Sequence, residues 1–346
     1  MINHQEKYFK YKTKYLELKN NKPTQTGSSK NNCNDVLYHG SKITYTNGKI
    51  TQKNYKSTCD TMYQIASCSK FITSLIVAKL YELNKLDYDS DINKYLKKWK
   101  CPVDGITLKY LLTHTSGSSD HNGYLGMEPQ IPYKQNLKLN IDIITGNSYS
   151  KPFNITEKPG TKFMYSGAGY QVIQQVLEEI TGKRLYQLMD QYIFKQLGMK
   201  NSTGKLLYEQ KHKYKLADMD GLYRMYPETA AAGVWMSCND LLNLGLDLMN
   251  SYNNDSGKIL QQKTVKMITR GEHPEWQKQY ANYGLGMFVG EIGGKKLFAH
   301  GGSNYGYQMY FRCVPDAKLN QIEITMLSYN PKYFKELGKE IRNKSN

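Results

Sequence analysis

The sequence has 346 residues, 39% of them hydrophobic, which is enough for one large domain or two small ones. It contains no run of about 18 apolar residues, so no transmembrane helix is expected. The N-terminus lacks the apolar region of a signal peptide, and we therefore expect a cytoplasmic location.

The net charge of +17 allows two explanations. A basic surface attracts nucleic acid or acidic partners, whereas a lysine-rich composition can also be a background property. No nucleic-acid-binding motif accompanies the charge, so we favour the second explanation over a nucleic-acid partner. The six cysteines include no C-x-x-C pair, which argues against a zinc site or a disulfide framework.

Residues 1–34 are predicted to form a basic N-terminal helix and a linker, followed by one domain over residues 35–346. Tyr8, Tyr11, Tyr15 and Leu18 form a stripe that predicts a helix over residues 5–20. Docking on the domain is favoured over pairing with a partner helix or contact with a membrane surface. In composition, this leader resembles N-terminal stretches of some giant DNA virus proteins.

The domain begins with a pattern typical of strands. Residues 36–50 predict a hairpin that turns at Gly40–Ser41 and ends at Asn47–Gly48. A long apolar helix follows, and its start carries the pattern S-x-x-K at Ser67 and Lys70. Residues three apart are neighbours on a helix, so Lys70 is expected beneath the Ser67 hydroxyl.

The S-x-x-K pattern has a catalytic and a structural interpretation. A serine hydroxyl becomes a useful nucleophile when a neighbouring group takes its proton, and a partly buried amine can take part in that transfer. A serine that caps a helix beside a solvated lysine gives the same pattern. The pattern alone favours the structural interpretation, and the motifs further along the chain reverse that preference.

Helices are predicted to dominate the middle of the chain, and strands its end. The predicted helices cover residues 107–112, halted at His114–Gly117, then a segment ending at Gly182, then residues 184–197 and 240–250. Residues 118–160 are expected to form a long loop. Strands are predicted at 283–290, 295–300, 306–314 and 321–327, with a turn at Gly293–Gly294 and a closing helix over 331–343. We therefore predict an α+β fold whose antiparallel sheet uses both chain ends, is flanked by helices and encloses a mainly helical middle region.

Four motifs occur in order: Ser67-x-x-Lys70, His114-Thr115-Ser116-Gly117, Tyr165-Ser166-Gly167 and His300-Gly301-Gly302. Together they resemble the serine β-lactamase and penicillin-binding-protein-like superfamily, in particular the class C β-lactamases and their esterase and D-aminopeptidase relatives. The resemblance covers about residues 36–343 and implies a β-lactamase/transpeptidase-like fold.

The resemblance also implies a role for each matching residue. Ser67 would be the nucleophile of an acyl-enzyme, Lys70 would share its proton, and Tyr165 would act as general base and then acid. Ser303 and Ser67 would supply the backbone N–H groups of an oxyanion hole. The motif that contains His300 and Gly302 would line the pocket opposite Ser67. The resemblance implies no metal or organic cofactor.

Two positions depart from efficient β-lactamases. Those enzymes usually have asparagine where Gly167 stands, and often have lysine where His300 stands. The glycine removes an amide that contacts the lysine and the substrate, and a histidine is only partly charged near pH 7. A tyrosine base needs nearby cations, for which Lys70 and His300 are the candidates.

The sequence leaves alternatives open. Tyr165 is one of 30 tyrosines, His300 can be a structural histidine, and His114 is expected to brace a turn, so it is left out of the site. The predicted function is a serine hydrolase acting on a small-molecule acyl substrate: a β-lactam, an ester or a D-amino-acid amide. The alternatives are an esterase or D-aminopeptidase with little β-lactamase activity and a non-catalytic binding protein on the same fold. The oligomeric state is left open.

Overall fold

A computed structural model describes residues 38–118, 140–147, 151–205, 213–217, 225–272, 282–316 and 318–330. Nearly all of these residues belong to one compact unit, Tyr38–Ser328. The predicted leader, its boundary with the domain at residues 34/35 and the predicted closing helix lie outside the described residues. Within the described part, no helix combines the length and the apolar character needed to cross a membrane.

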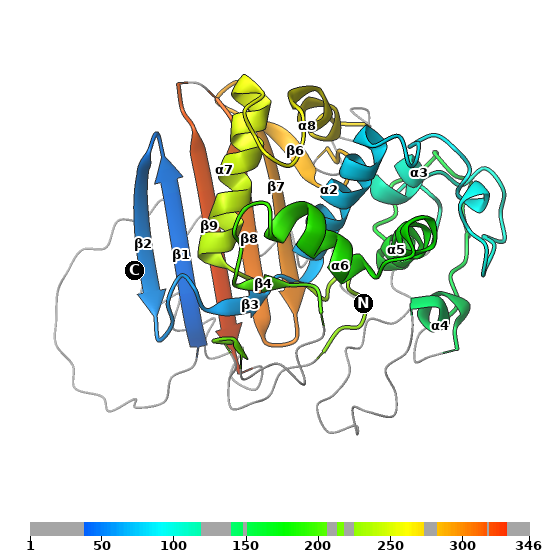
Figure 1. Cartoon of the computed structure of the whole chain (residues 1–346), viewed down its shortest axis with the longest axis horizontal. Helices are drawn as coiled ribbons and strands as arrows, with labels where there is room; N and C mark the ends of the chain where they lie inside the picture. Colours follow the sequence, from blue (N-terminus) through cyan, green and yellow to red (C-terminus); the bar gives the residue numbers. More distant parts are fainter. Residues whose placement is uncertain are drawn as a thin grey trace. The chain divides into compact units, whose positions relative to one another are not determined.

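A six-stranded sheet forms one layer of this unit (Figure 1), with the strand order β2-β1-β9-β8-β7-β6. The hairpin partners β1–β2, β6–β7, β7–β8 and β8–β9 pair antiparallel. This order confirms the predicted sheet built from both chain ends. The strands are β1 (Tyr38–Thr46), β2 (Lys49–Tyr55), β6 (Phe288–Ile292), β7 (Lys295–Asn304), β8 (Tyr307–Val314) and β9 (Gln321–Tyr329).

The first hairpin turns later than the sequence predicted. β1 runs straight through Gly40–Ser41, and the chain reverses at Asn47–Gly48, where φ is 47° and 89°. Asn-Gly tolerates these positive φ values and is the preferred pair for such turns. Gly40 serves another purpose, because a Cβ there would lie 2.9 Å from Cδ2 of Leu327 on the adjacent strand. The predicted turn at Gly40–Ser41 was therefore wrong.

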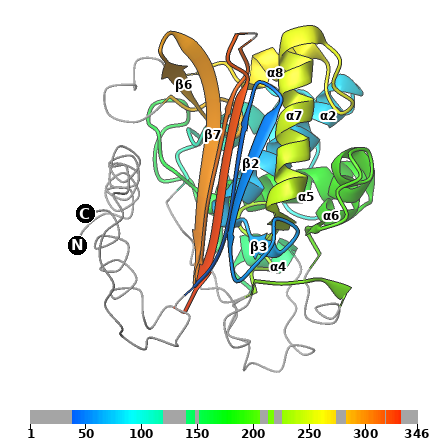
Figure 2. The ribbon, with the colours of Figure 1, turned by 90° about the vertical axis from the view of Figure 1, so that its left-hand side faces the viewer.

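The described helices α2, α5, α6, α7 and α8 cover one face of this sheet (Figure 2). Among them, α2 is buried along most of its length, as its broad apolar surface predicted. Its Phe71 ring packs 5.4 Å from Phe311 and 6.4 Å from Phe298, both on the sheet. The helices are α2 (Ser69–Glu82), α3 (Leu108–Leu112), α4 (Asn140–Thr145), α5 (Gly167–Thr181), α6 (Leu185–Met189), α7 (Cys238–Asn254) and α8 (Gln262–Ile268), with shorter helical turns at η1 (Ala66–Cys68), η2 (Ile92–Lys94) and η4 (Asp190–Phe194).

A second, small sheet was not predicted. Its strands lie in the order β3-β5-β4, with β3 at Met62–Gln64, β5 at Trp235–Ser237 and β4 at Ser202–Thr203. The strand β3 leads into Ser67, and β5 follows directly after Val234. The pairing of β3 with β5 therefore brings two distant parts of the chain to the same place.

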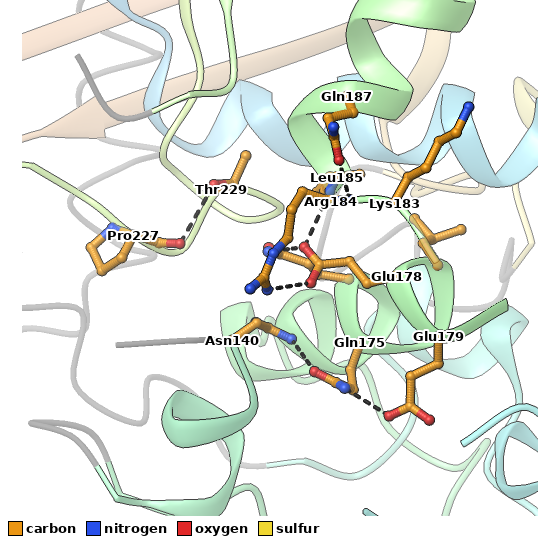
Figure 3. Close-up of polar contacts among 12 residues, drawn as sticks. Asn140, Gln175, Glu178, Glu179, Lys183, Arg184, Leu185, Gln187, Pro227 and Thr229 are labelled. Atoms are coloured by element: carbon orange, nitrogen blue, oxygen red, sulfur yellow. Dashed lines mark hydrogen bonds and ion pairs between the residues drawn. The ribbon is translucent and has the colours of Figure 1, made fainter. Parts of the chain in front are cut away.

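Helix α5 is fixed at both ends. The Ser166 hydroxyl accepts a hydrogen bond from Gly169 N–H at 3.1 Å, which caps its start, and Gly182 at φ 67° ends it as predicted. Near that end, Glu178 accepts hydrogen bonds from the Arg184 side chain at 3.0 Å and from Leu185 N–H at 3.1 Å (Figure 3). These bonds join the end of α5 to α6. Tyr165 therefore lies two residues before a helix that is held at both ends.

Three other predicted elements differ from the structure. Part of the predicted loop over 118–160 is the short helix α4, whereas residues 119–139 and 148–150 lie outside the described residues. The predicted helix over 184–197 is α6 followed by the wider turn η4. The predicted strand at 283–290 begins only at Phe288, because Gly284 N–H bonds to Met287 O at 2.9 Å and closes a turn before it.

Candidate active site

Ser67 lies on a tight turn at the start of α2. The turn η1 spans Ala66–Cys68, and Cys68 N–H bonds to Ile65 O at 3.0 Å. Ala66 has a φ of 49°, a conformation that costs about 1–3 kcal/mol for a residue other than glycine. Cys68 is completely buried, and burial raises the pKa of its thiol, so this residue packs in the core.

Lys70 lies one turn beyond Ser67, as the S-x-x-K spacing predicted. Its Nζ donates hydrogen bonds to Ser67 Oγ at 3.3 Å and to Ala231 O at 2.9 Å. The residue is only 2% exposed, so these partners replace water around the amine. The solvated lysine of the structural interpretation is excluded by this burial.

Two tyrosine rings lie beside the Lys70 amine. Nζ is 4.9 Å from the centre of the Tyr165 ring and 5.6 Å from that of Tyr170. Tyr170 is fully buried, and its hydroxyl donates to Leu112 O at 3.0 Å. Burial, and then the neighbouring Tyr165, raise the pKa of Tyr170 well above its usual range, so this phenol stays protonated. Tyr165 is partly exposed, which makes it the better candidate for proton transfer.

Sequence reasoning missed the segment 230–234, which completes the surroundings of Lys70. Besides the Ala231 carbonyl, it offers Ala230 O to the Thr73 hydroxyl at 3.0 Å and Val234 N–H to the Ser69 hydroxyl at 3.1 Å. These bonds tie the segment to the first turns of α2. Every residue has a backbone carbonyl, so the sequence does not show which carbonyl binds Lys70. The only signal is the run of small side chains, Ala-Ala-Ala-Gly, which lets this segment approach α2 closely.

The strand β7 passes directly over the Ser67 turn. A Cβ on Gly302 would lie 2.2 Å from Ile65 O and 3.0 Å from Ser67 N, so only glycine fits. Ser303 follows and is exposed. The next residue, Asn304, donates to Gln64 Oε1 at 2.7 Å and to Ala232 O at 3.1 Å, which ties the strand end to the site.

Of the seven predicted site residues, Ser67, Lys70, Tyr165 and Gly302 converge. Gly167 is the first residue of α5, two positions beyond Tyr165. Within the described part of the chain, no group of three or more His, Cys, Asp or Glu side chains is placed to hold a metal ion.

His300 is buried, and both of its ring nitrogens have partners inside the protein. Its Nδ1 lies 2.7 Å from Gly301 O, and a carbonyl only accepts, so Nδ1 carries the proton. Its Nε2 then accepts from the Tyr283 hydroxyl at 3.1 Å. The ring is 1% exposed; burial, with a further contribution from the Lys70 charge, lowers the pKa of His300 to about 3. Of the two candidate cations, Lys70 and His300, the Lys70 amine is the one beside the Tyr165 ring, and the bonds of His300 favour its structural interpretation.

This neutral histidine makes folding stability depend on pH. Between pH 6.5 and 3, the unfolded chain protonates His300 while the folded chain does not, so stability falls as pH falls. The limiting slope for one such group is about 1.4 kcal/mol per pH unit. We expect the free energy of unfolding, measured with urea, to fall less between pH 6.5 and 4.5 in His300→Gln than in the unaltered protein. Parallel losses in the two proteins would contradict a neutral His300.

Comparison with known families agrees with this geometry. The model of the Beta-lactamase family matches residues 36–341. The chain belongs to the beta-lactamase family. This membership confirms the family resemblance of the four motifs, and with it the predicted fold.

Curated relatives in this family have more than one named activity. Penicillin-binding protein 4* of Bacillus subtilis is 28% identical over 168 residues, which cover 48% of this chain and 34% of that protein. A putative D-alanyl-D-alanine carboxypeptidase of Escherichia coli is 23% identical, covering 74% and 66%. The teichoic acid D-alanine hydrolase of Staphylococcus aureus is 30% identical, covering 49% and 42%. The chain thus spans between a third and two thirds of the length of these relatives.

Solved structures share the same beta-lactamase-type fold. The octameric penicillin-binding protein homologue from Pyrococcus abyssi superposes with a TM-score of 0.67 at 23% identity, covering 86% of this chain and 71% of that one. The D-amino acid amidase from Ochrobactrum anthropi gives 0.67 at 19% identity, covering 84% and 86%. These likenesses extend over most of both chains.

Proposed function

We propose that this beta-lactamase family member is a serine hydrolase that works through an acyl-enzyme on Ser67. Lys70 and Tyr165 move the proton, and the backbone N–H groups of Ser67 and Ser303 receive the developing oxyanion. The observation that carries the proposal is the 3.3 Å contact between Lys70 Nζ and Ser67 Oγ, beside the Tyr165 ring. A nucleophile within hydrogen-bond reach of a buried amine is the arrangement that acyl transfer needs.

The reaction has two balanced steps. Ser67 Oγ loses its proton to the Lys70–Tyr165 pair and bonds to the substrate carbonyl carbon. The bond to the leaving group then breaks, and Tyr165 returns the proton to it. In the second step, water gives a proton to the same pair and attacks the acyl carbon. The bond between this carbon and Ser67 Oγ then breaks, and the pair returns the proton to Oγ, which restores the Ser67 hydroxyl.

The close approach of β7 supports the proposed oxyanion hole. Gly302 lies against Ser67 N, and Ser303 is the next residue on that strand. Donors held in place before the reaction stabilise the oxyanion without reorganising, and one such donor is worth about 10²–10³ in kcat.

The environment of His300 indicates which acyl donors fit best. Both ring nitrogens are bonded inside the protein, and the imidazole is neutral, so this position of β7 offers no cation to a substrate carboxylate. A hydrogen bond to a charged group is worth about 1.5–3 kcal/mol, or roughly 10- to 150-fold in rate. We therefore propose esters and amides of D-amino acids with uncharged leaving groups as substrates. The names of the teichoic acid D-alanine hydrolase and the D-amino acid amidase agree with this class.

A matched pair of substrates tests both parts of the proposal. D-alanyl ethylamide and D-alanyl-D-alanine differ only in the carboxylate of the leaving amine, and the chromogenic cephalosporin nitrocefin represents β-lactams. We expect kcat/KM for the amide to exceed that for the dipeptide by at least 10-fold. Intact-mass spectra should show an acyl adduct that is absent from Ser67→Ala.

Three results would count against the proposal. Equal acylation of the unaltered protein and of Ser67→Ala would remove Ser67 as the nucleophile. A faster reaction with nitrocefin or the dipeptide would retain the hydrolase but overturn the preference for uncharged leaving groups. If no donor acylates the protein, the fold serves binding rather than catalysis.

A further inference from the structure

His114 is a buried histidine that the proposed reaction does not use. It lies just beyond α3, is 1% exposed and has a φ of 60°. Its backbone carbonyl accepts a hydrogen bond from Met164 N–H at 2.7 Å. A positive φ in a buried residue other than glycine costs energy and persists only where the surroundings enforce it.

The side chain of His114 contacts the two residues that follow Met164. Its ring lies 4.1 Å from the Tyr165 ring, centre to centre, with the planes inclined by 32°. Its Nδ1 accepts a hydrogen bond from Ser166 N–H at 3.0 Å. One residue therefore binds three consecutive positions, with Tyr165 in the middle.

The segment held in this way belongs to no helix or strand. Residues 163–166 are irregular until α5 begins at Gly167, so backbone pairing within an element does not fix the Tyr165 ring. Further rings surround His114: Tyr283 at 5.0 Å, Tyr170 at 5.3 Å and Phe163 at 5.7 Å. Such packing leaves the imidazole little freedom to move.

We propose that His114 is a positioning residue that holds the Tyr165 phenol beside the Lys70 amine. This inference rests on the proposed acyl-enzyme function, in which Tyr165 moves the proton. The hydrogen bond from Ser166 N–H fixes the backbone after Tyr165, and the imidazole ring packed against the phenol fixes the direction of the Tyr165 side chain. His114 itself touches no reacting atom in this role.

Two variants separate the hydrogen bond from the ring. Asparagine and glycine both tolerate a φ of 60°, so neither His114→Asn nor His114→Gly adds backbone strain. The asparagine Oδ1 offers an acceptor near the place of Nδ1, whereas glycine removes both acceptor and ring. Phe163→Leu is the control, because leucine keeps an apolar side chain against the imidazole and leaves both the Ser166 N–H···Nδ1 bond and the Tyr165 ring contact of His114 in place.

The measurement is hydrolysis of D-alanyl p-nitroanilide, with kcat expressed per site that a fluorophosphonate labels at completion. Displacement of a catalytic group by about 1 Å can cost 10²-fold, so we expect His114→Gly to lose about 10²-fold in kcat. His114→Asn should lose about 10-fold, with KM within 3-fold of the unaltered protein in both. The basic limb of the pH–rate profile should move in His114→Gly. Phe163→Leu should keep kcat per site within 3-fold.

A purely structural His114 would reduce the number of labelled sites but not kcat per labelled site. Values of kcat per site within 2-fold of the unaltered protein in both His114 variants would therefore overturn the positioning role. Equal losses in His114→Asn and His114→Gly would overturn the role of the hydrogen bond. If the unaltered protein neither reacts with the fluorophosphonate nor hydrolyses the anilide, the proposed function itself fails, which is a distinguishable result.

Discussion

Replacing Lys70 with methionine is expected to lower kcat/KM for a D-amino-acid ester or amide by about 10³-fold, within the range for loss of a general acid–base group. Methionine keeps most of the side-chain volume but cannot take a proton from Ser67 Oγ, which lies 3.3 Å from Nζ. It also leaves the buried Ala231 carbonyl without its donor, at a cost of about 1–3 kcal/mol in stability. Steady-state kinetics and a thermal unfolding curve measure the two effects separately.

The matched control for this change is Lys79→Met, on the same helix. Lys79 pairs with Glu82 at 3.3 Å, and its side chain is 26% exposed, so its amine stays close to solvent. Lys79 lies nine residues beyond Lys70 on α2, about 13 Å along the helix axis, so its amine is far from Ser67 and we expect kcat/KM to stay within 2-fold. A Lys70→Met protein that folds and retains activity comparable to this control would show that the amine is not the proton acceptor.

Adding one methyl group at Gly302 is expected to have the second large effect. In Gly302→Ala the new Cβ would meet Ile65 O at 2.2 Å and Ala66 Cβ at 3.0 Å, so β7 must withdraw from the turn that carries Ser67. Overpacking of this kind costs about 1–3 kcal/mol in stability. The withdrawal also separates the proposed oxyanion donors, and we expect a fall in kcat of about 10²-fold, measured with the same amide.

Gly290→Ala provides the comparison within the same sheet. Its new Cβ would find its nearest neighbour, Leu297 Cδ1, at 4.0 Å, which is an ordinary contact. This variant should keep the activity and the unfolding temperature of the unaltered protein. If Gly302→Ala behaves like Gly290→Ala, the approach of β7 to Ser67 has no bearing on the rate.

The parts of the fold that local patterns determine were predictable from the sequence. The apolar surface of α2, the glycine at the end of α5 and the Gly293–Gly294 turn each depend on a few neighbouring residues. The joining of strands from both chain ends in one sheet was also predicted, but contacts between particular residues of distant segments were not. Gly40 resembles a turn residue, but its purpose is the packing of Leu327, which lies on a strand from the other end of the chain. The pairing of β3 with β5 escaped prediction for the same reason.

In the candidate site, too, contacts between neighbouring residues were predictable and contacts between distant residues were not. Ser67 and Lys70 are three residues apart on one turn, so their contact followed from spacing alone, whereas the approach of Tyr165 was predicted only through the family resemblance. The Ala231 carbonyl carries no side-chain signal, so the sequence could not reveal it. The protonation of His300 was not readable from the motif, because burial and the nearby Lys70 charge lower its pKa and neither is visible in the sequence.

The junction between β1 and β9 has a consequence for how the protein is made. At the end of this junction, Asn47 and Asn320 exchange hydrogen bonds of 2.9 Å across 273 positions of sequence. At about 5–20 residues per second, a ribosome needs roughly 15–55 s to bridge that separation. During this time the first hairpin is outside the ribosome without its central neighbour. Assembly of the large sheet must therefore wait until β9, which ends at Tyr329, has been synthesised. Until then the nascent chain is the form most exposed to aggregation and most dependent on chaperones.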